Sequence, residues 1–312
     1  MSTPSVPVLS PASSSVGRWA ASRARWTFPV LVANLVAQIV IIGTGGAVRL
    51  TASGLGCSTW PQCEPGHFTP MHVDAATYHT AIEFGNRMVT GILVVVAVLV
   101  AVVVSTNGER ARSYRLLGLV PLGGVLVQAV IGGIAVLVKL NPAIVASHLL
   151  ISMALVSVST VLIRRHSGGD GAPRPVVAPS SIALSRALVV MTAVVLALGV
   201  VVTGSGPHSG DTVVGYRFAV NPAAMAMVHA GAVWVFLGVL MTIVGVIWRQ
   251  QAPAQVRRAA FVVLAVTAVQ GAVGYVQYAA GLPAFLVGVH MVLAALLTVA
   301  VSWFVTTLRV RD

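Results

Sequence analysis

The sequence predicts an all-α membrane protein whose eight transmembrane helices form two tandem four-helix bundles. Of its 312 residues, 57% are hydrophobic and only 8% are charged, whereas soluble domains carry roughly 25% charged residues. The apolar residues also form long uninterrupted runs, and runs of about 20 residues cross a bilayer as helices. In addition, the second half of the chain repeats features of the first half, which predicts two related bundles.

The apolar runs define the expected domain organisation. They lie near residues 27–47, 80–104, 115–138, 143–163, 184–203, 223–248, 259–279 and 284–307. The first run is too long for a cleaved signal peptide. We expect a disordered cytoplasmic N-terminus (1–26, rich in Ser, Pro and Arg), an N-terminal bundle (27–163), a flexible cytoplasmic linker (164–183) and a C-terminal bundle (184–308).

Basic residues account for the net charge of +12. Fifteen of the 19 Lys and Arg residues fall in segments on one side of the predicted membrane, and Arg87 falls inside the second helix. Only Arg49, Lys139 and Arg217 fall on the other side. This asymmetry predicts a multi-pass protein of the cell membrane with both termini in the cytoplasm. The positive charge therefore orients the chain, and we expect no nucleic-acid partner.

The repeat is clearest around two glutamine–histidine pairs. Gln128 and His148 are 20 residues apart, as are Gln270 and His290, and a proline opens the following helix in both halves. Four helices per repeat give both halves the same orientation in the membrane. The expected relation between the bundles is therefore a pseudo-twofold axis along the membrane normal.

Two histidines of the second half point to a metal cofactor. His229 and His290 each lie about six residues from the outer start of a helix, which puts both roughly 9 Å deep. Ionisable groups inside a membrane are costly and usually functional, and paired imidazoles in a four-helix bundle suit the axial positions of a haem iron. The alternative is that each histidine only bonds a neighbouring helix. Zinc is less favoured because no third or fourth ligand is obvious.

The first half carries His148 but no clear second histidine. The same spacing leads to Asn86, beside Arg87 and one turn after Glu83. Glu83 and Arg87 share a helix face, so they either form a stabilising ion pair, or Arg87 binds a propionate while Glu83 handles protons or developing positive charge. His79, one turn earlier, either bonds Glu83, reaches the iron or has a surface role.

The only two cysteines, Cys57 and Cys63, lie in an outer loop, where disulfides persist. We expect them to form a disulfide, either as a structural staple or as a redox-active pair near the substrate entrance. No CxxC haem-attachment motif is present, so any haem is expected to be held without covalent bonds.

Several features follow one another along the chain: "GGAVRLTASGLGCSTWPQC", "IEFGNR", the histidine at 148, "TGSGPHSGD" and the histidine pair at 229 and 290. In this order they resemble the pattern of haem A synthases, and the resemblance covers roughly residues 27–307. The resemblance implies a C-terminal bundle holding haem b between His229 and His290. It implies an N-terminal bundle that oxidises the C8 methyl group of haem O to a formyl group with oxygen from water, through an alcohol and a hydrate.

In that implied reaction His148 ligates the substrate iron, Glu83 is the catalytic carboxylate with Arg87 beside it, and the cysteine pair assists substrate handling. Haem b relays electrons, and the product serves cytochrome c oxidase. The expected partners are haem O synthase and a membrane electron acceptor, with homo-oligomers compatible. One departure is Asn86, which stands where the family commonly has histidine, so either a single axial ligand suffices or His79 substitutes. The alternatives are a non-catalytic b-type cytochrome or a haem carrier.

Overall fold

The structure, a computed structural model, describes residues 15–71 and 77–312. Within these ranges eight helical spans are long and apolar enough to cross a membrane, as the sequence predicts. The long helices are α1 (Ser15–Leu50), α2 (Thr77–Ser105), α4 (Val120–Leu137), α5 (Pro142–Ser167), α6 (Pro179–Ser205), α7 (Pro222–Arg249), α8 (Ala254–Ala279) and α9 (Ala284–Thr307). A short helix, α3 (Arg112–Leu117), precedes α4 and belongs to the third span.

Most helix ends lie within a few residues of the predicted positions, and the larger differences have local causes. Helix α1 begins at Ser15 rather than near residue 27, because Ala and Arg in this stretch favour helix. The expected disordered segment therefore overlaps α1, and its first 14 residues lie outside the described part of the chain. The third span breaks between α3 and α4, where Gly118 ends one helix and Pro121 opens the next.

Asparagine–proline pairs define where two helices of the outer end begin. The Asn141 side chain accepts a hydrogen bond from the Ala143 N–H at 3.0 Å, and the Asn221 side chain accepts one from the Ala224 N–H at 3.0 Å. Each asparagine satisfies a free amide of the first turn, and the proline that follows needs no amide partner. These caps fix the starts of α5 and α7, the helices that carry His148 and His229.

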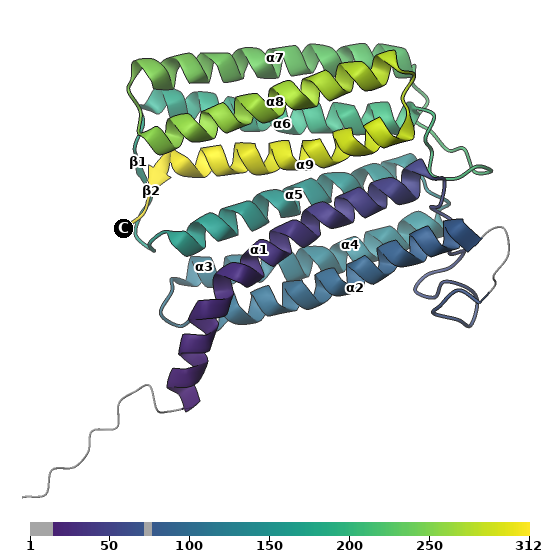
Figure 1. Ribbon diagram of the computed structural model, residues 1–312, viewed down its shortest axis with the longest axis horizontal. Helices are drawn as coiled ribbons and strands as arrows, with labels where there is room; N and C mark the ends of the chain where they lie inside the picture. Colours follow the sequence, from purple (N-terminus) through teal and green to yellow (C-terminus); the bar gives the residue numbers. More distant parts are fainter. Residues whose placement is uncertain (1–14, 72–76) are drawn as a thin grey trace, which may run out of the picture.

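The helices form two groups that follow the order of the chain (Figure 1). Helices α1, α2, α4 and α5 pack together, and α6, α7, α8 and α9 form the second group. The groups meet where α1 and α5 contact α9, and where α5 contacts α6. The buried side chains at this contact are Ile42, Met153, Val156 and Ala295. The predicted twofold relation and the domain boundaries stay predictions.

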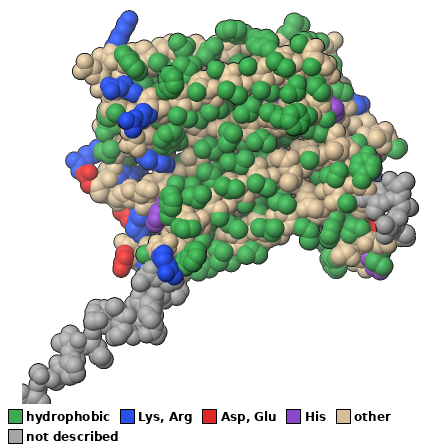
Figure 2. Space-filling model, viewed as in Figure 1, with side chains coloured by type: hydrophobic (Ala, Val, Ile, Leu, Met, Phe, Trp, Pro, Cys, Tyr) green, Lys and Arg blue, Asp and Glu red, His purple; other side chains and the backbone are tan. Residues whose placement is uncertain are grey.

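Charged side chains gather at one end of the molecule. Figure 2 shows Lys and Arg clustered at the end that carries α3, β1 (Arg174–Pro175) and β2 (Arg309–Val310), with an apolar surface along the helices. This is the distribution that the positive-inside rule requires of a membrane protein. The cytoplasmic placement of this end remains a prediction.

The expected linker makes specific contacts at this basic end. Strands β1 and β2 pair antiparallel, with Arg174 opposite Val310. The Asp170 carboxylate accepts hydrogen bonds from Arg110 Nε at 2.7 Å and from the Ala111 N–H at 2.8 Å. The guanidinium of Arg110 is the main reason why the pKa of Asp170 lies below its ordinary value of 3.8. Asp170 thus ties the linker to the segment that precedes α3.

We predict that Asp170→Asn lowers the stability of the fold by about 1 kcal/mol, the scale of a partly exposed charge-assisted hydrogen bond. A lowered pKa means that the carboxylate stabilises the fold above its ordinary pKa and that this contribution is lost as the pH falls below it. Thermal unfolding in detergent at pH 7 and near pH 3 measures both effects. The matched control is Asp312→Asn, because the Arg174–Asp312 pair is 73% and 67% exposed and should contribute little. Equal melting temperatures for the two variants at pH 7 would contradict this role.

Candidate functional site

A cavity of about 400 Å3 lies inside the N-terminal group of helices. Its walls come from α1, α2, α4 and α5, and residues of α6 and α9 close one side. Its volume falls in the range of small-molecule and cofactor sites. The polar side chains in its wall include Gln38, Arg49, Glu83, Asn86, Arg87, Gln128 and His148. The cavity thus brings together Glu83, Asn86, Arg87 and His148, four residues that the sequence assigns to one substrate site.

The two ends of the cavity differ in chemistry. One end lies toward the 51–71 loop, near the end of α1 and the start of α2, and it carries Arg49, Glu83 and Arg87. Leu93 and Leu155 line the other end. At 1.5 Å per residue they lie roughly 20–24 Å along their helices from the starts of α2 and α5. The cavity therefore suits a ligand with a polar edge and a hydrocarbon part.

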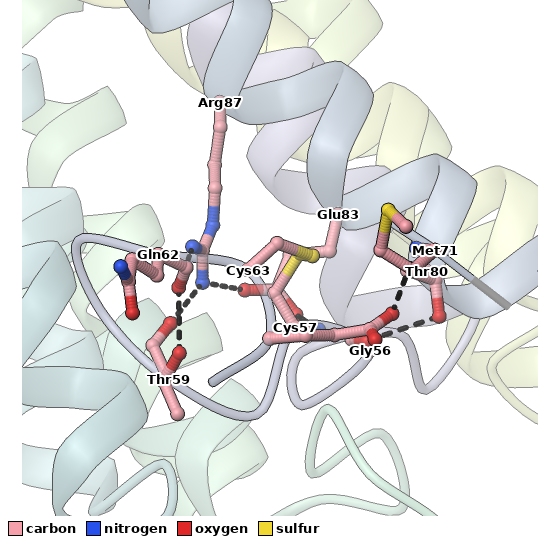
Figure 3. The surroundings of a disulfide bond; sticks show 10 residues. Gly56, Cys57, Thr59, Gln62, Cys63, Met71, Thr80, Glu83 and Arg87 are labelled. Atoms are coloured by element: carbon pink, nitrogen blue, oxygen red, sulfur yellow. Dashed lines mark hydrogen bonds and ion pairs between the residues drawn. A yellow bond between two sulfur atoms is a disulfide. The ribbon is translucent and has the colours of Figure 1, made fainter. Parts of the chain in front are cut away.

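The Glu83 carboxylate is fixed on both oxygens. Its Oε1 pairs with Arg87 Nη2 at 2.7 Å, and its Oε2 accepts the Cys57 N–H at 2.7 Å (Figure 3). The residue is only 5% exposed. Buried carboxylates need such partners; of the two roles that the sequence leaves open for Glu83 and Arg87, the ion pair is present. Because Glu83 also faces the cavity, its carboxylate is held in place beside any molecule bound there.

Arg87 also holds the outer loop. Its Nη1 donates to the Gln62 carbonyl and its Nη2 to the Thr59 carbonyl, both at 3.0 Å (Figure 3). These two bonds and the Glu83 pair occupy the planar donor fork of the guanidinium. The geometry therefore gives Arg87 a loop-anchoring role, and its contact with a propionate stays a prediction.

The predicted disulfide joins Cys57 and Cys63, with an S–S distance of 2.02 Å and both residues fully buried. Inside this small ring, Trp60 lines the cavity and packs against Gly133 of α4. A Cβ atom on Gly133 would lie 2.4 Å from the indole, so this close approach requires glycine. The disulfide ring is therefore part of the cavity wall, whereas its redox activity stays a prediction.

His79 and Asn86 have different surroundings. His79 Nδ1 lies 3.0 Å from Ser53 Oγ, and in the described part of the chain neither a bond to Glu83 nor a place in the cavity wall is found for it. Asn86 does line the cavity, and its Oδ1 accepts a hydrogen bond from Thr44 Oγ1 at 2.7 Å. Asn86 and His148 thus both line the cavity, and the Asn86 amide oxygen is already hydrogen-bonded.

His148 is oriented by its neighbours on α4. Gln128 Nε2 lies 2.8 Å from the His148 carbonyl oxygen and 3.5 Å from its Nδ1. Gly132 of α4 lies close to the ring, since a Cβ atom there would lie 3.1 Å from His148 Nε2. Glycine is therefore what allows the imidazole to approach α4 here, and both residues line the cavity.

The second half repeats this arrangement. Gln270 Nε2 lies 3.1 Å from the His290 carbonyl oxygen, and a Cβ atom on Gly274 would lie 3.1 Å from the His290 ring. A Cβ atom on Gly199 would likewise lie 3.1 Å from the His229 ring.

The Nδ1 atoms of both His229 and His290 are buried without a hydrogen-bond partner among the described residues. Buried polar atoms normally have partners, so each of these imidazoles has unused capacity to bind another group. Among the described residues no group of three or more His, Cys, Asp or Glu side chains is placed to hold a metal. The residues that are present thus fit a porphyrin iron with two axial imidazoles, which supplies its other ligands itself.

One site residue was missed from the sequence. Arg49 was counted only as a basic residue of the sparsely charged side, yet the structure places it in the cavity wall. Its position in the last turn of α1, just before the loop with the cysteines, was the available signal.

Comparisons with known proteins identify a matching family and similar curated sequences. Residues 25–208 match the family described as "Cytochrome oxidase assembly protein". Among curated relatives, "Heme A synthase" of Lysinibacillus sphaericus is 34% identical over 133 residues, 42% of this chain and 41% of the relative. "Heme A synthase" of Bacillus pumilus is 33% identical over 135 residues, 43% of this chain and 41% of the relative. This chain therefore matches less than half of the length of these relatives. The family match contains Glu83, Arg87 and His148.

We predict that Arg87→Ala loosens the outer loop and exposes the disulfide. Both cysteines are fully buried, and the variant removes two hydrogen bonds to the loop together with the partner of Glu83. A bulky water-soluble phosphine should then reduce the disulfide at least tenfold faster than in the unchanged protein. Lowering the free energy of loop opening by about 1.4 kcal/mol raises the population of the open loop tenfold. Lys139→Ala, which removes an exposed positive charge from the same end, is the control. Unchanged reduction kinetics in Arg87→Ala would refute the anchoring role.

Proposed function

We propose that this chain, which belongs to the cytochrome oxidase assembly protein family, is a haem A synthase that oxidises the C8 methyl group of haem O to a formyl group. The observation that carries the proposal is the cavity in which the Glu83 carboxylate and the His148 imidazole face the same space. The names of the relatives support this activity. The details that follow rest on the residues of this chain.

The cavity provides the features that an amphipathic porphyrin substrate requires. His148 lines the cavity, so its imidazole would ligate the substrate iron. Asn86 on α2 lines the cavity and is already hydrogen-bonded to Thr44. Amide oxygen is a poor ligand for haem iron compared with imidazole. We therefore propose that His148 is the single protein ligand of the substrate iron, so that His79 need not act as a second axial ligand.

Glu83 is placed to manage protons during the oxidation. Each of the two hydroxylations takes its oxygen from water and releases two electrons and two protons; the resulting hydrate loses water to give the aldehyde. A buried carboxylate beside the methyl group can accept a proton from the attacking water and stabilise positive charge on the carbon. Cys57 N–H and Arg87 hold both carboxylate oxygens, so no reorganisation of Glu83 is needed.

The C-terminal pair, His229 and His290, would hold haem b. When bound there, haem b supplies one-electron redox chemistry, through which the electrons of the reaction leave for a membrane acceptor. The next residue after His290, Met291, lines the N-terminal cavity and lies against Gly46 of α1. The two sites therefore approach each other through consecutive residues of α9. We further propose that the protein acts in the cell membrane with both termini in the cytoplasm, and that haem O synthase delivers the substrate.

The first test is production of haem A in cells that accumulate haem O. Co-expression of this chain with a haem O synthase should yield haem A or its hydroxylated intermediate in extracted haems. Glu83→Gln keeps the size of the side chain but removes the base, and we expect at least a hundredfold loss of product, within the usual contribution of a general base. Glu64→Gln, in the same loop region, is the control. If cells that express the unchanged, folded protein contain haem O but no haem A or hydroxylated intermediate, the proposed function is rejected.

The second test concerns the resident haem. The purified protein should show a low-spin b-type Soret band, and His229→Ala or His290→Ala should abolish or shift it. His208→Ala, whose ring instead bonds the Leu282 carbonyl at 2.9 Å, should leave the band unchanged. A Soret band that is unaffected in both ligand variants would show that the iron is held elsewhere.

A further inference from the structure

Arg49 is a cation in the cavity wall without a counter-ion. It lies in the last turn of α1 and lines the cavity together with Glu83 and Arg87. Those two residues neutralise each other through their 2.7 Å ion pair. No ion pair of Arg49 with a carboxylate is found in the described ranges, 15–71 and 77–312. A charge within a membrane-spanning segment is expensive unless it is compensated, so the cavity lacks one negative charge.

The contacts of Arg49 leave part of its guanidinium free. Its Nη2 donates to the Thr203 carbonyl on α6 at 2.9 Å. This bond and the favourable position of a cation at a helix C-terminus explain part of its stability there. However, its Nε is buried and has no hydrogen-bond partner within the described residues. Buried donors normally have partners, so Arg49 retains directed hydrogen-bonding capacity inside the site.

Arg217 is another arginine of the loops at this end of the molecule. It is exposed and donates to three backbone carbonyls, those of Gly206, Pro207 and Gly215. It does not line the cavity, whereas Arg49 does.

We propose that Arg49 binds a carboxylate of the molecule that occupies this cavity, and so determines its orientation. Guanidinium–carboxylate contacts are directional and strong. The carboxylate would meet Arg49 at the loop-side end, and the hydrocarbon part would extend toward Leu93 and Leu155. This inference rests on the proposed function for the identity of the ligand, a porphyrin with propionate groups.

The proposed orientation agrees with the chemistry of haem O. The C8 methyl group shares a pyrrole ring with a propionate, whereas the farnesyl-bearing ring lies opposite the other propionate-bearing ring. Anchoring the propionates at Arg49 therefore brings the methyl group to the end where Glu83 lies and directs the farnesyl chain to the apolar end. Arg49 is a positioning residue, and Glu83 performs the proton chemistry.

The experiment compares a porphyrin acid with its ester. Purified protein that carries its resident haem is titrated with zinc protoporphyrin IX and with zinc protoporphyrin IX dimethyl ester, and binding is followed by fluorescence. The unchanged protein should bind the free acid about tenfold or more tightly than the ester, on the scale of one charge-assisted contact. Equal affinities, or no binding of the free acid, would overturn the proposal, and this comparison does not depend on any variant folding.

Variants assign the preference to one residue. Arg49→Gln should bind acid and ester alike, Arg49→Lys should keep part of the preference, and Lys139→Gln should keep all of it, since Lys139 is exposed at the same end but does not line the cavity. A full preference in Arg49→Gln would overturn the assignment. Haem A formation with equal binding of acid and ester would reject only the role of Arg49; preferential acid binding without haem A formation would reject only the proposed reaction.

Discussion

The structure of the site depends on the buried Glu83 carboxylate and the groups that hold it. The carboxylate joins three parts of the chain: its own helix α2, the guanidinium of Arg87 one turn later, and the backbone of Cys57 in the disulfide ring. Arg87 then extends to the loop carbonyls of Thr59 and Gln62. Because a buried charge is tolerated only when it is paired and hydrogen-bonded, this network fixes the loop over the cavity. The pairing that lets a carboxylate be buried here also holds it beside the cavity.

The two halves of the chain share a local arrangement. In each half a glutamine contacts the carbonyl of the histidine 20 residues later, and a glycine lies close to the imidazole. In the second half a further histidine, His229, lies close to its own glycine, Gly199. In the first half the repeat spacing leads to Asn86, which bonds Thr44 instead. Under the proposed function, this difference would leave the substrate iron with one protein ligand and the haem b iron with two.

The sequence predicted the membrane class, the eight spans and the disulfide, because each follows from local rules such as run length, charge and the outer-loop position of the cysteines. Helical spacing placed Glu83 and Arg87 on one face but left open whether they pair. The sequence also predicted that Glu83, Asn86, Arg87 and His148 share a site, from repeat spacing and a family resemblance. It could not show that Arg87 holds the loop or that His79 bonds Ser53, because these depend on how a loop of irregular backbone folds back on α2. The place of Arg49 in the cavity wall was hidden from the sequence in a similar way, because its contact with the Thr203 carbonyl depends on how distant segments fold together.

The central claim is that the substrate reacts inside the N-terminal bundle. A cryo-electron microscopy structure of the purified protein with bound haem O tests it most directly. The account predicts porphyrin density in the cavity, with iron at His148, the C8 methyl group beside Glu83 and a separate haem between His229 and His290. Haem O bound only on the lipid-facing surface, or with its methyl group directed away from Glu83, would contradict it.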